Sequence, residues 1–182
     1  VIVLALSYLF QGSAFSATEP IKWSVVFYVG FDEEELADRA AHLIPELLRQ
    51  KLPPNVEFLI EEDNWTEEGK PESVKRYVHS AEGTKVEELP EHDSASPQAL
   101  DGFLKWVKKT ARGKNQIFFL MTHSWGWKGT IQDFRIPGAP KNHNTMMPIR
   151  ELKRVMTENQ YHPDILFLDT CNLGNAEIIH EL

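Results

Sequence analysis

Short apolar runs alternate along the chain with longer stretches in which apolar residues recur at helical spacing. The first run, Trp23 to Val29, is almost continuously apolar, as expected for a strand buried on both faces of a parallel sheet. Three later runs have the same character. The pattern therefore predicts four strands, over residues 23–29, 56–60, 117–121 and 165–168.

The stretches between these runs predict helices and two irregular regions. Residues 32–50 have a helical apolar face, and acidic residues from Asp32 to Glu35 occupy the first turn, where the helix dipole favours negative charge. Ser96 and Pro97 have the residue types of an N-cap and a first helical position. Further helices are predicted over 145–158 and from about Gly174 onward. Residues 61–95 predict irregular structure or a small hairpin, and 122–145 lack any regular pattern.

This alternation indicates an α/β fold with a parallel sheet and helices on both faces. With 42% hydrophobic and 25% charged residues, the composition suits one globular domain. Residues 1–10 are apolar and small residues follow, so we interpret 1–17 as part of a secretory signal peptide and 18–182 as the domain. The last helix stops at Leu182 after barely two turns, so we expect a domain that is incomplete at its C-terminus or one product of a proteolytic cut.

Charge and cysteine content exclude several classes of function. The chain carries 27 acidic and 19 basic residues, a net charge of −8, with no basic stripe, so we expect no nucleic-acid partner. The early apolar run is too short to span a bilayer as a helix. One cysteine allows no disulfide within the chain and no Cys-rich zinc site. The histidines other than His123 lack metal-ligand spacing and are read as surface or packing residues, so no metal and no cofactor is predicted.

Two chemically capable residues directly follow predicted strands. His123 comes after the 117–121 strand, and Cys171 after the 165–168 strand. Ligands of parallel α/β sheets gather outside the carboxyl ends of the strands. A cysteine before a helix has a stabilised thiolate, and a nearby histidine can serve as base and then acid. Alone, a cysteine is more often a small buried hydrophobe and a histidine a hydrogen-bonded loop residue. Their joint placement favours acyl transfer, with oxyanion donors from the backbone of Cys171 and of the loop bearing Ser124 and Gly126.

The residues around this pair resemble a known family. Thr122-His123-Ser124-Trp125-Gly126-Trp127 resembles the His-Gly-x-Gly-Trp segment of clostripain-like cysteine peptidases. Phe167-Leu168-Asp169-Thr170-Cys171 resembles their Phe-Asp-Ala-Cys segment, and Glu177 falls where they carry an acidic residue. The resemblance extends over about residues 22–182. The order and spacing of the two segments that carry His123 and Cys171 also match the broader caspase, gingipain and legumain group.

The resemblance implies a caspase-like three-layer αβα fold with a mostly parallel sheet. It implies a cysteine endopeptidase with His123 and Cys171 as the catalytic pair and a thioester acyl-enzyme. The predicted signal peptide indicates that the protein is secreted or periplasmic. Asp169 would line the pocket for a P1 arginine or lysine, although an ordinary strand-end carboxylate is an equal interpretation. Maturation by internal cleavage would give a second chain as partner.

The sequence leaves one alternative to an active cysteine peptidase open and disfavours another. Ser124 replaces the usual glycine after the histidine, and its Cβ could strain an oxyanion donor. The chain could therefore be a catalytically weak or inactive homologue that acts as a binding or regulatory module. A serine hydrolase using Ser124 is disfavoured, because the Gly-x-Ser-x-Gly pattern is absent.

Overall fold

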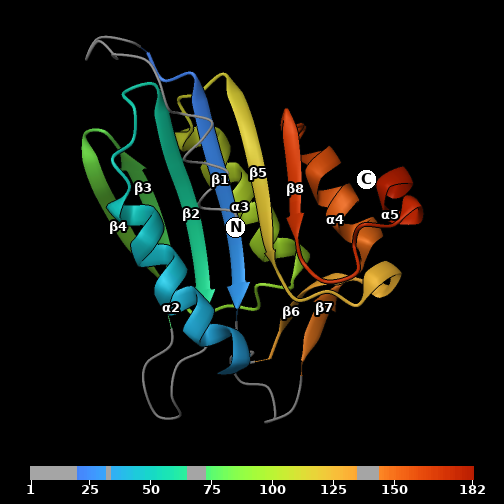
Figure 1. Cartoon of the computed structure of the whole chain (residues 1–182). Coiled ribbons are helices and arrows are strands. Elements are labelled where there is room, and N and C mark those ends of the chain that lie inside the picture. Colours follow the sequence, from blue (N-terminus) through green and yellow to red (C-terminus); the bar gives the residue numbers. More distant parts are fainter. Residues whose placement is uncertain (1–19, 32–33, 65–72, 135–143) are drawn as a thin grey trace.

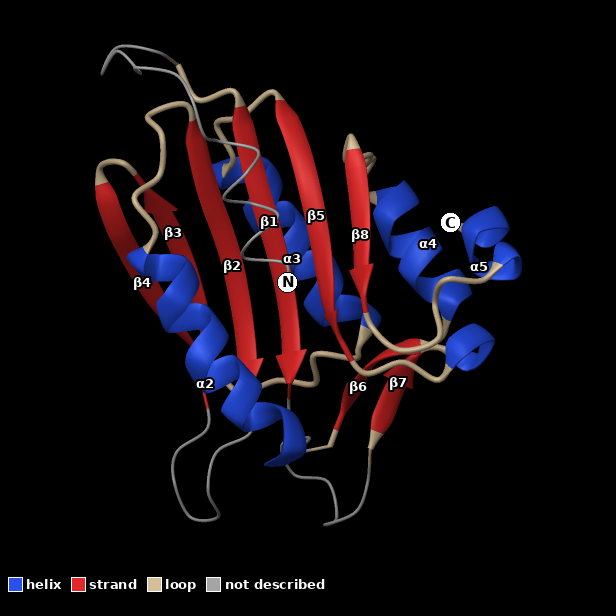
Figure 2. Ribbon diagram, in the orientation of Figure 1, coloured by secondary structure: helices blue, strands red, loops and turns tan. Residues whose placement is uncertain are grey.

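A computed structural model describes residues 20–31, 34–64, 73–134 and 144–182. Its centre is a six-stranded sheet in the order β4-β3-β2-β1-β5-β8 (Figure 2). The four strands from β2 to β8 run parallel and match the four predicted runs. They are β1 (Trp23–Phe31), β2 (Val56–Asn64), β5 (Asn115–Thr122) and β8 (Ile165–Asp169).

Helices cover both faces of this sheet, as the sequence predicted (Figure 1). Helix α2 (Glu34–Arg49) packs on one face, and α3 (Pro97–Thr110) and α4 (Ile149–Glu158) pack on the other. Strand β1 is apolar throughout because its residues alternate between the two cores: Val25 and Phe27 pack under α2, whereas Val26 and Tyr28 pack under α3. A last short helix, α5 (Ala176–Glu181), follows β8, and Asn175 caps it.

Helix α3 begins where the sequence predicted it. The Ser96 hydroxyl accepts a hydrogen bond from the Ala99 N–H at 3.1 Å, and Pro97 is the first helical residue. The acidic first turn predicted near Asp32 lies outside the described residues and side chains.

Residues 61–95 contain more regular structure than predicted. Strands β3 (Ser73–Ser80) and β4 (Gly83–Pro90) form an antiparallel hairpin that extends the main sheet next to β2. Of the two predicted possibilities, irregular structure or a small hairpin, the hairpin is confirmed, although its strands are longer than expected. The signal was weak because β4 is an edge strand with almost every residue exposed, so no buried apolar face alternates along it.

The prediction that residues 122–145 hold no regular element was wrong. Strand β6 (Thr130–Asp133) pairs antiparallel with β7 (Thr145–Met147), and a 3-10 turn, η1 (Gly126–Lys128), precedes them. The predicted helix from Thr145 therefore starts only at Ile149, with Pro148 at the N-cap position. Both strands are too short for periodicity, and their pairing joins segments separated along the chain.

Candidate active site

The strand register places His123 and Cys171 at equivalent positions. Met121 in β5 pairs with Asp169 in β8, so each of the two residues lies two positions beyond this pair. The arrowheads of both strands point to the same edge of the sheet (Figure 1). The two loops that carry the predicted catalytic pair therefore leave the sheet side by side.

The two loops also touch each other. Gly126 has a φ of +63°, and a Cβ added there would lie 3.5 Å from the Asn172 carbonyl oxygen and 3.7 Å from its Cβ. Glycine is the residue that adopts this conformation without a steric penalty. Asn172, directly after Cys171, has a φ of +58°, which asparagine tolerates better than most residues. The backbone turns at both loops thus bring the segment after His123 against the segment after Cys171.

His123 is held against the small sheet formed by β6 and β7. Its ring meets the Phe134 ring edge to face, with 6.1 Å between centroids. Its carbonyl oxygen accepts a long hydrogen bond of 3.4 Å from the Thr130 hydroxyl. The His123 side chain is half-buried, whereas Cys171 is an exposed free thiol. The alternative interpretation of Cys171 as a buried hydrophobe is therefore wrong, and the residue is open to solvent.

Ser124 braces the loop after His123. It is buried, bridges to Thr130 in the small sheet, and its hydroxyl accepts a hydrogen bond from the Gly126 N–H at 3.2 Å. Ser124 is not among the described residues with positive φ, so its Cβ imposes no left-handed strain. A buried hydroxyl engaged in this way does not suit a nucleophile. The Gly126 N–H, one of the predicted oxyanion donors, is engaged here with the Ser124 hydroxyl.

Asp169 forms an ion pair that the sequence did not suggest. The Arg39 Nη2 atom of α2 lies 3.0 Å from the Asp169 Oδ2 atom, with the side chains 51% and 22% exposed. The Arg39 guanidinium carbon also lies 5.6 Å from the centroid of the Phe31 ring. Because 130 residues separate the two charges, no local pattern could have revealed the pair.

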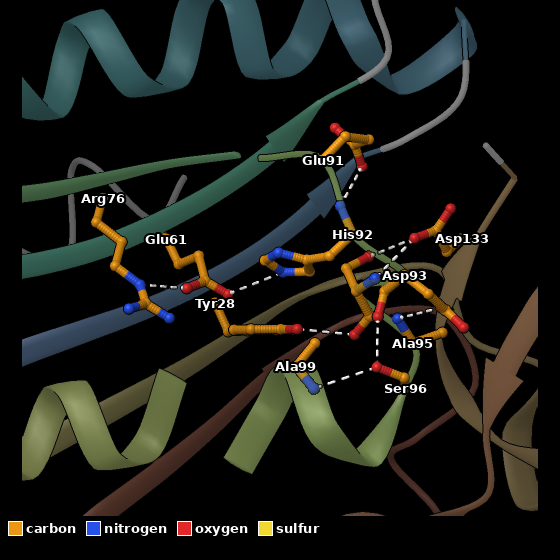
Figure 3. Close-up of polar contacts among 11 residues, drawn as sticks. Tyr28, Glu61, Arg76, Glu91, His92, Asp93, Ala95, Ser96, Ala99 and Asp133 are labelled. Atoms are coloured by element: carbon orange, nitrogen blue, oxygen red, sulfur yellow. Dashed lines mark hydrogen bonds and ion pairs between the residues drawn. The ribbon is translucent and has the colours of Figure 1, made fainter. Parts of the chain in front are cut away.

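A second polar network lies at the ends of β1 and β6 (Figure 3). The Tyr28 hydroxyl donates to the Ser94 carbonyl at 2.7 Å, and the Ser94 N–H donates to Asp133 at 2.7 Å. The Thr145 hydroxyl donates to Asp93 at 2.6 Å. These bonds join both strands of the small sheet to the segment before α3. They position the sheet that carries Phe134 next to His123.

Three carboxylates meet near this network. Oxygens of Asp63, Glu91 and Asp133 lie within 4.8 Å of one another. Sequence reasoning missed this cluster because its members come from separate elements. The Asp133 carboxylate of this cluster already accepts hydrogen bonds from the Ser94 N–H and hydroxyl, and we assign no metal to the three.

Glu61 in β2 should make stability depend on pH. Burial raises the pKa of this carboxyl from 4.5 to about 7, against the lowering effect of Arg76 at 2.6 Å, while His92 lies 3.9 Å away. A raised pKa means that the folded chain binds more protons than the unfolded chain between these values. The contribution of Glu61 is complete below pH 4.5 and is lost as pH rises through about 7.

Replacing Glu61 with glutamine is therefore expected to flatten the decline in unfolding free energy between about pH 5 and pH 7. Urea unfolding of both proteins at four pH values measures this decline. The exposed Glu46→Gln variant serves as a control and should follow the wild-type curve. An equally steep decline in Glu61→Gln would contradict the assignment.

A cavity of about 620 Å³ opens beside the paired loops. Trp127 on its rim is 75% exposed and Trp125 nearby is 62% exposed, the latter held by a 2.7 Å bond from its indole N–H to Gln132. Aromatic side chains on a cavity rim suit contacts with a peptide. Its lining residues come from η1, α4 and α5: Trp127, Lys128, Pro148, Ile149, Arg150, Glu177, Ile178 and Glu181.

Two further sequence-based interpretations concern histidines and membranes. His79 is buried and bonded to Thr84 and to the Gln50 carbonyl, which confirms it as a packing residue. His143 lies outside the described residues. None of the helices in the described part of the chain is long and apolar enough to cross a bilayer.

Comparison with solved structures identifies the class of fold. A secreted C11 cysteine protease from Bacteroides thetaiotaomicron, bound to an irreversible peptide inhibitor, superposes with a TM-score of 0.69 at 16% identity, covering 89% of this chain and 46% of that one. The protease iotapain from the same species gives a TM-score of 0.66 at 11% identity, covering 90% and 50%. An inactive zymogen C11 protease from Parabacteroides distasonis gives 0.59 at 18%, covering 84% and 43%.

These similarities confirm the predicted caspase-like α/β fold of the clostripain-like, or C11, cysteine proteases. The chain spans about half the length of each of these structures. No family model and no curated protein sequence matches it. At these identities the likeness concerns the fold, and the chemistry rests on the residues of this chain.

Proposed function

We propose that this chain carries the catalytic residues of a cysteine endopeptidase, with His123 and Cys171 as the working pair. The observation that supports it best is the register of β5 and β8, which sends the two loops out side by side with Cys171 exposed. The C11 cysteine proteases have the same fold.

The proposed reaction uses the parts in two steps. His123 accepts the thiol proton of Cys171, and the thiolate attacks the carbonyl carbon of the scissile bond. Backbone N–H groups of Ser124, Gly126 and Cys171 donate hydrogen bonds to the oxyanion. The Gly126 N–H gives up its bond to the Ser124 hydroxyl in order to do so. His123 then gives the proton to the leaving amine. Water hydrolyses the thioester with His123 as base, and the thiol is restored.

The test uses the full-length protein, because the structurally similar proteases are about twice as long as this chain. A peptidyl chloromethyl ketone with arginine at P1 should alkylate Cys171, and mass spectrometry of the digested protein locates the adduct. Fluorogenic peptides with P1 arginine or lysine should be hydrolysed. A thiol that alkylates no faster than free cysteine, together with no hydrolysis, would leave the inactive binding module as the better account.

Asp169 is the proposed determinant of a basic P1 preference. Replacing Asp169 with asparagine is expected to reduce the kcat/KM ratio of P1-arginine to P1-norleucine substrates about tenfold or more, because a hydrogen bond to a charged group is worth about 1.5–3 kcal/mol. The comparison of both substrates on both proteins measures the change. An unchanged ratio would place the P1 determinant elsewhere in the full-length protein.

We also propose that the protein is exported and matures by internal cleavage. Two of the structurally similar proteases are secreted, and another is a zymogen. The predicted signal peptide, residues 1–17, lies outside the described part of the chain.

A further inference from the structure

We propose that Arg39 is a built-in occupant of the subsite at Asp169 and limits the selectivity for a basic P1 residue. This inference rests on the proposed peptidase function. A substrate arginine reaching Asp169 would meet a carboxylate that already binds a guanidinium at 3.0 Å. Arg39 is therefore a specificity-determining residue that acts by competition.

The position of Arg39 follows from the layer arrangement. Residue alternation puts Phe167 and Asp169 of β8 on the same face as Phe119 of β5, which is the face that α2 covers. The first turns of α2 lie near the carboxyl ends of the strands (Figure 1), and Arg39 belongs to the second of these turns. Its guanidinium lies against Phe31 at the end of β1 and reaches Asp169 at the end of β8, which is the edge where the His123 and Cys171 loops emerge.

The surroundings of the Arg39 guanidinium are those that would receive a substrate guanidinium. Asp169 supplies a carboxylate, and Phe31 supplies a ring whose centroid is 5.6 Å from the guanidinium carbon, within cation–π range. Phe31 is buried and ends β1, so the ring is firmly placed. The same two groups thus bind the internal arginine and would bind an arginine side chain of a peptide.

The exposure of the pair determines how strongly it competes. Arg39 is about half exposed, and exposed ion pairs are worth about 0–1 kcal/mol. Such a pair opens readily, so a substrate can displace Arg39. For a pair worth about 1 kcal/mol, the paired state outweighs the open state about fivefold. The apparent affinity for a basic P1 residue then falls by about the same factor.

The test compares three variants of the full-length protein by their selectivity. Replacing Arg39 with alanine should raise the kcat/KM ratio of P1-arginine to P1-norleucine substrates about fivefold, mainly through KM. Arg39→Lys should raise it less, because a cation remains. Arg49→Ala is the matched control: it removes an exposed arginine of the same helix, about 15 Å farther along, and should keep the wild-type ratio.

Two results would overturn the inference. One is an Arg39→Ala ratio that stays at the wild-type value or falls. The other is wild-type preference for a P1-aspartate substrate that Arg39→Ala abolishes, since Arg39 would then recognise substrate itself.

A binding measurement separates this inference from the peptidase proposal. Benzamidine, an aryl amidinium, should bind the Cys171→Ala protein about fivefold more tightly after the Arg39→Ala change, and calorimetry gives both constants. Adding Asp169→Asn should abolish the gain. If benzamidine binding changes in this way but proteins with Cys171 intact hydrolyse no peptide, the peptidase proposal is refuted and the occupied subsite stands. If peptides are hydrolysed but benzamidine binding does not change in this way, only the occupied subsite is refuted.

Discussion

Replacing Cys171 with alanine is expected to lower kcat/KM for P1-arginine peptides at least about 10⁴-fold, to the uncatalysed background. The reason is that Cys171 supplies the only thiol of the chain, and the proposed thioester cannot form without it. Cys171 is exposed and lies outside the buried cores. The substitution should therefore leave the fold intact, which thermal unfolding checks.

His123 provides the matched comparison. Catalytic groups that act as a unit are strongly non-additive, so His123→Gln should cost nearly as much as Cys171→Ala, and the double variant should cost little more. The rate of Cys171 alkylation at pH 7 should also fall in His123→Gln, because the base that removes the thiol proton is gone. Full activity in either single variant would contradict the proposed catalytic pair.

Replacing Glu57 with alanine is expected to lower the free energy of unfolding by about 3 kcal/mol. Glu57 in β2 is fully buried, and its carboxylate accepts hydrogen bonds from the Ser24 hydroxyl at 2.7 Å and from the Arg112 N–H and Nε at 2.6 and 2.8 Å. Alanine would leave these donors without an acceptor and would leave a cavity. The value is at the low end for a broken buried pair because the Arg112 guanidinium is half exposed.

Urea unfolding at pH 7 measures this loss, and Glu46→Ala is its control. Glu46 is exposed on α2, so its removal should change the unfolding free energy by less than about 0.5 kcal/mol. Glu57→Gln should fall between the two, because the amide keeps one acceptor and turns a donor toward the Arg112 Nε. Equal stability of Glu57→Ala and Glu46→Ala would contradict the anchoring role of Glu57.

The Glu57 network also fixes the loop after α3, which ends at Thr110. In this loop Glu57 binds Arg112, and the Gly113 N–H donates to the Ser24 hydroxyl at 2.9 Å. A Cβ at Gly113 would come within 2.4 Å of the Ser24 nitrogen. This contact joins distant segments, so no local pattern predicts it.

The sequence by itself determined the four parallel strands, the helices on both faces and the two residues at the strand ends. Each of these follows from a local pattern: apolar runs for buried strands, helical periodicity for α2, and the Ser96-Pro97 cap for α3. The placement of His123 and Cys171 after β5 and β8 needed only the rule that parallel strands end at one edge.

The tertiary structure decided what surrounds these residues. The small sheet of β6 and β7 that packs Phe134 on His123, the bracing of Gly126 by Ser124, and the Arg39–Asp169 pair all join segments that are apart in sequence or too short for periodicity. Such contacts depend on register and layer order, which the pattern of a single segment does not contain. The sequence alone thus placed the proposed nucleophile and base, and only the folded chain showed that Asp169, the proposed specificity residue, pairs with Arg39.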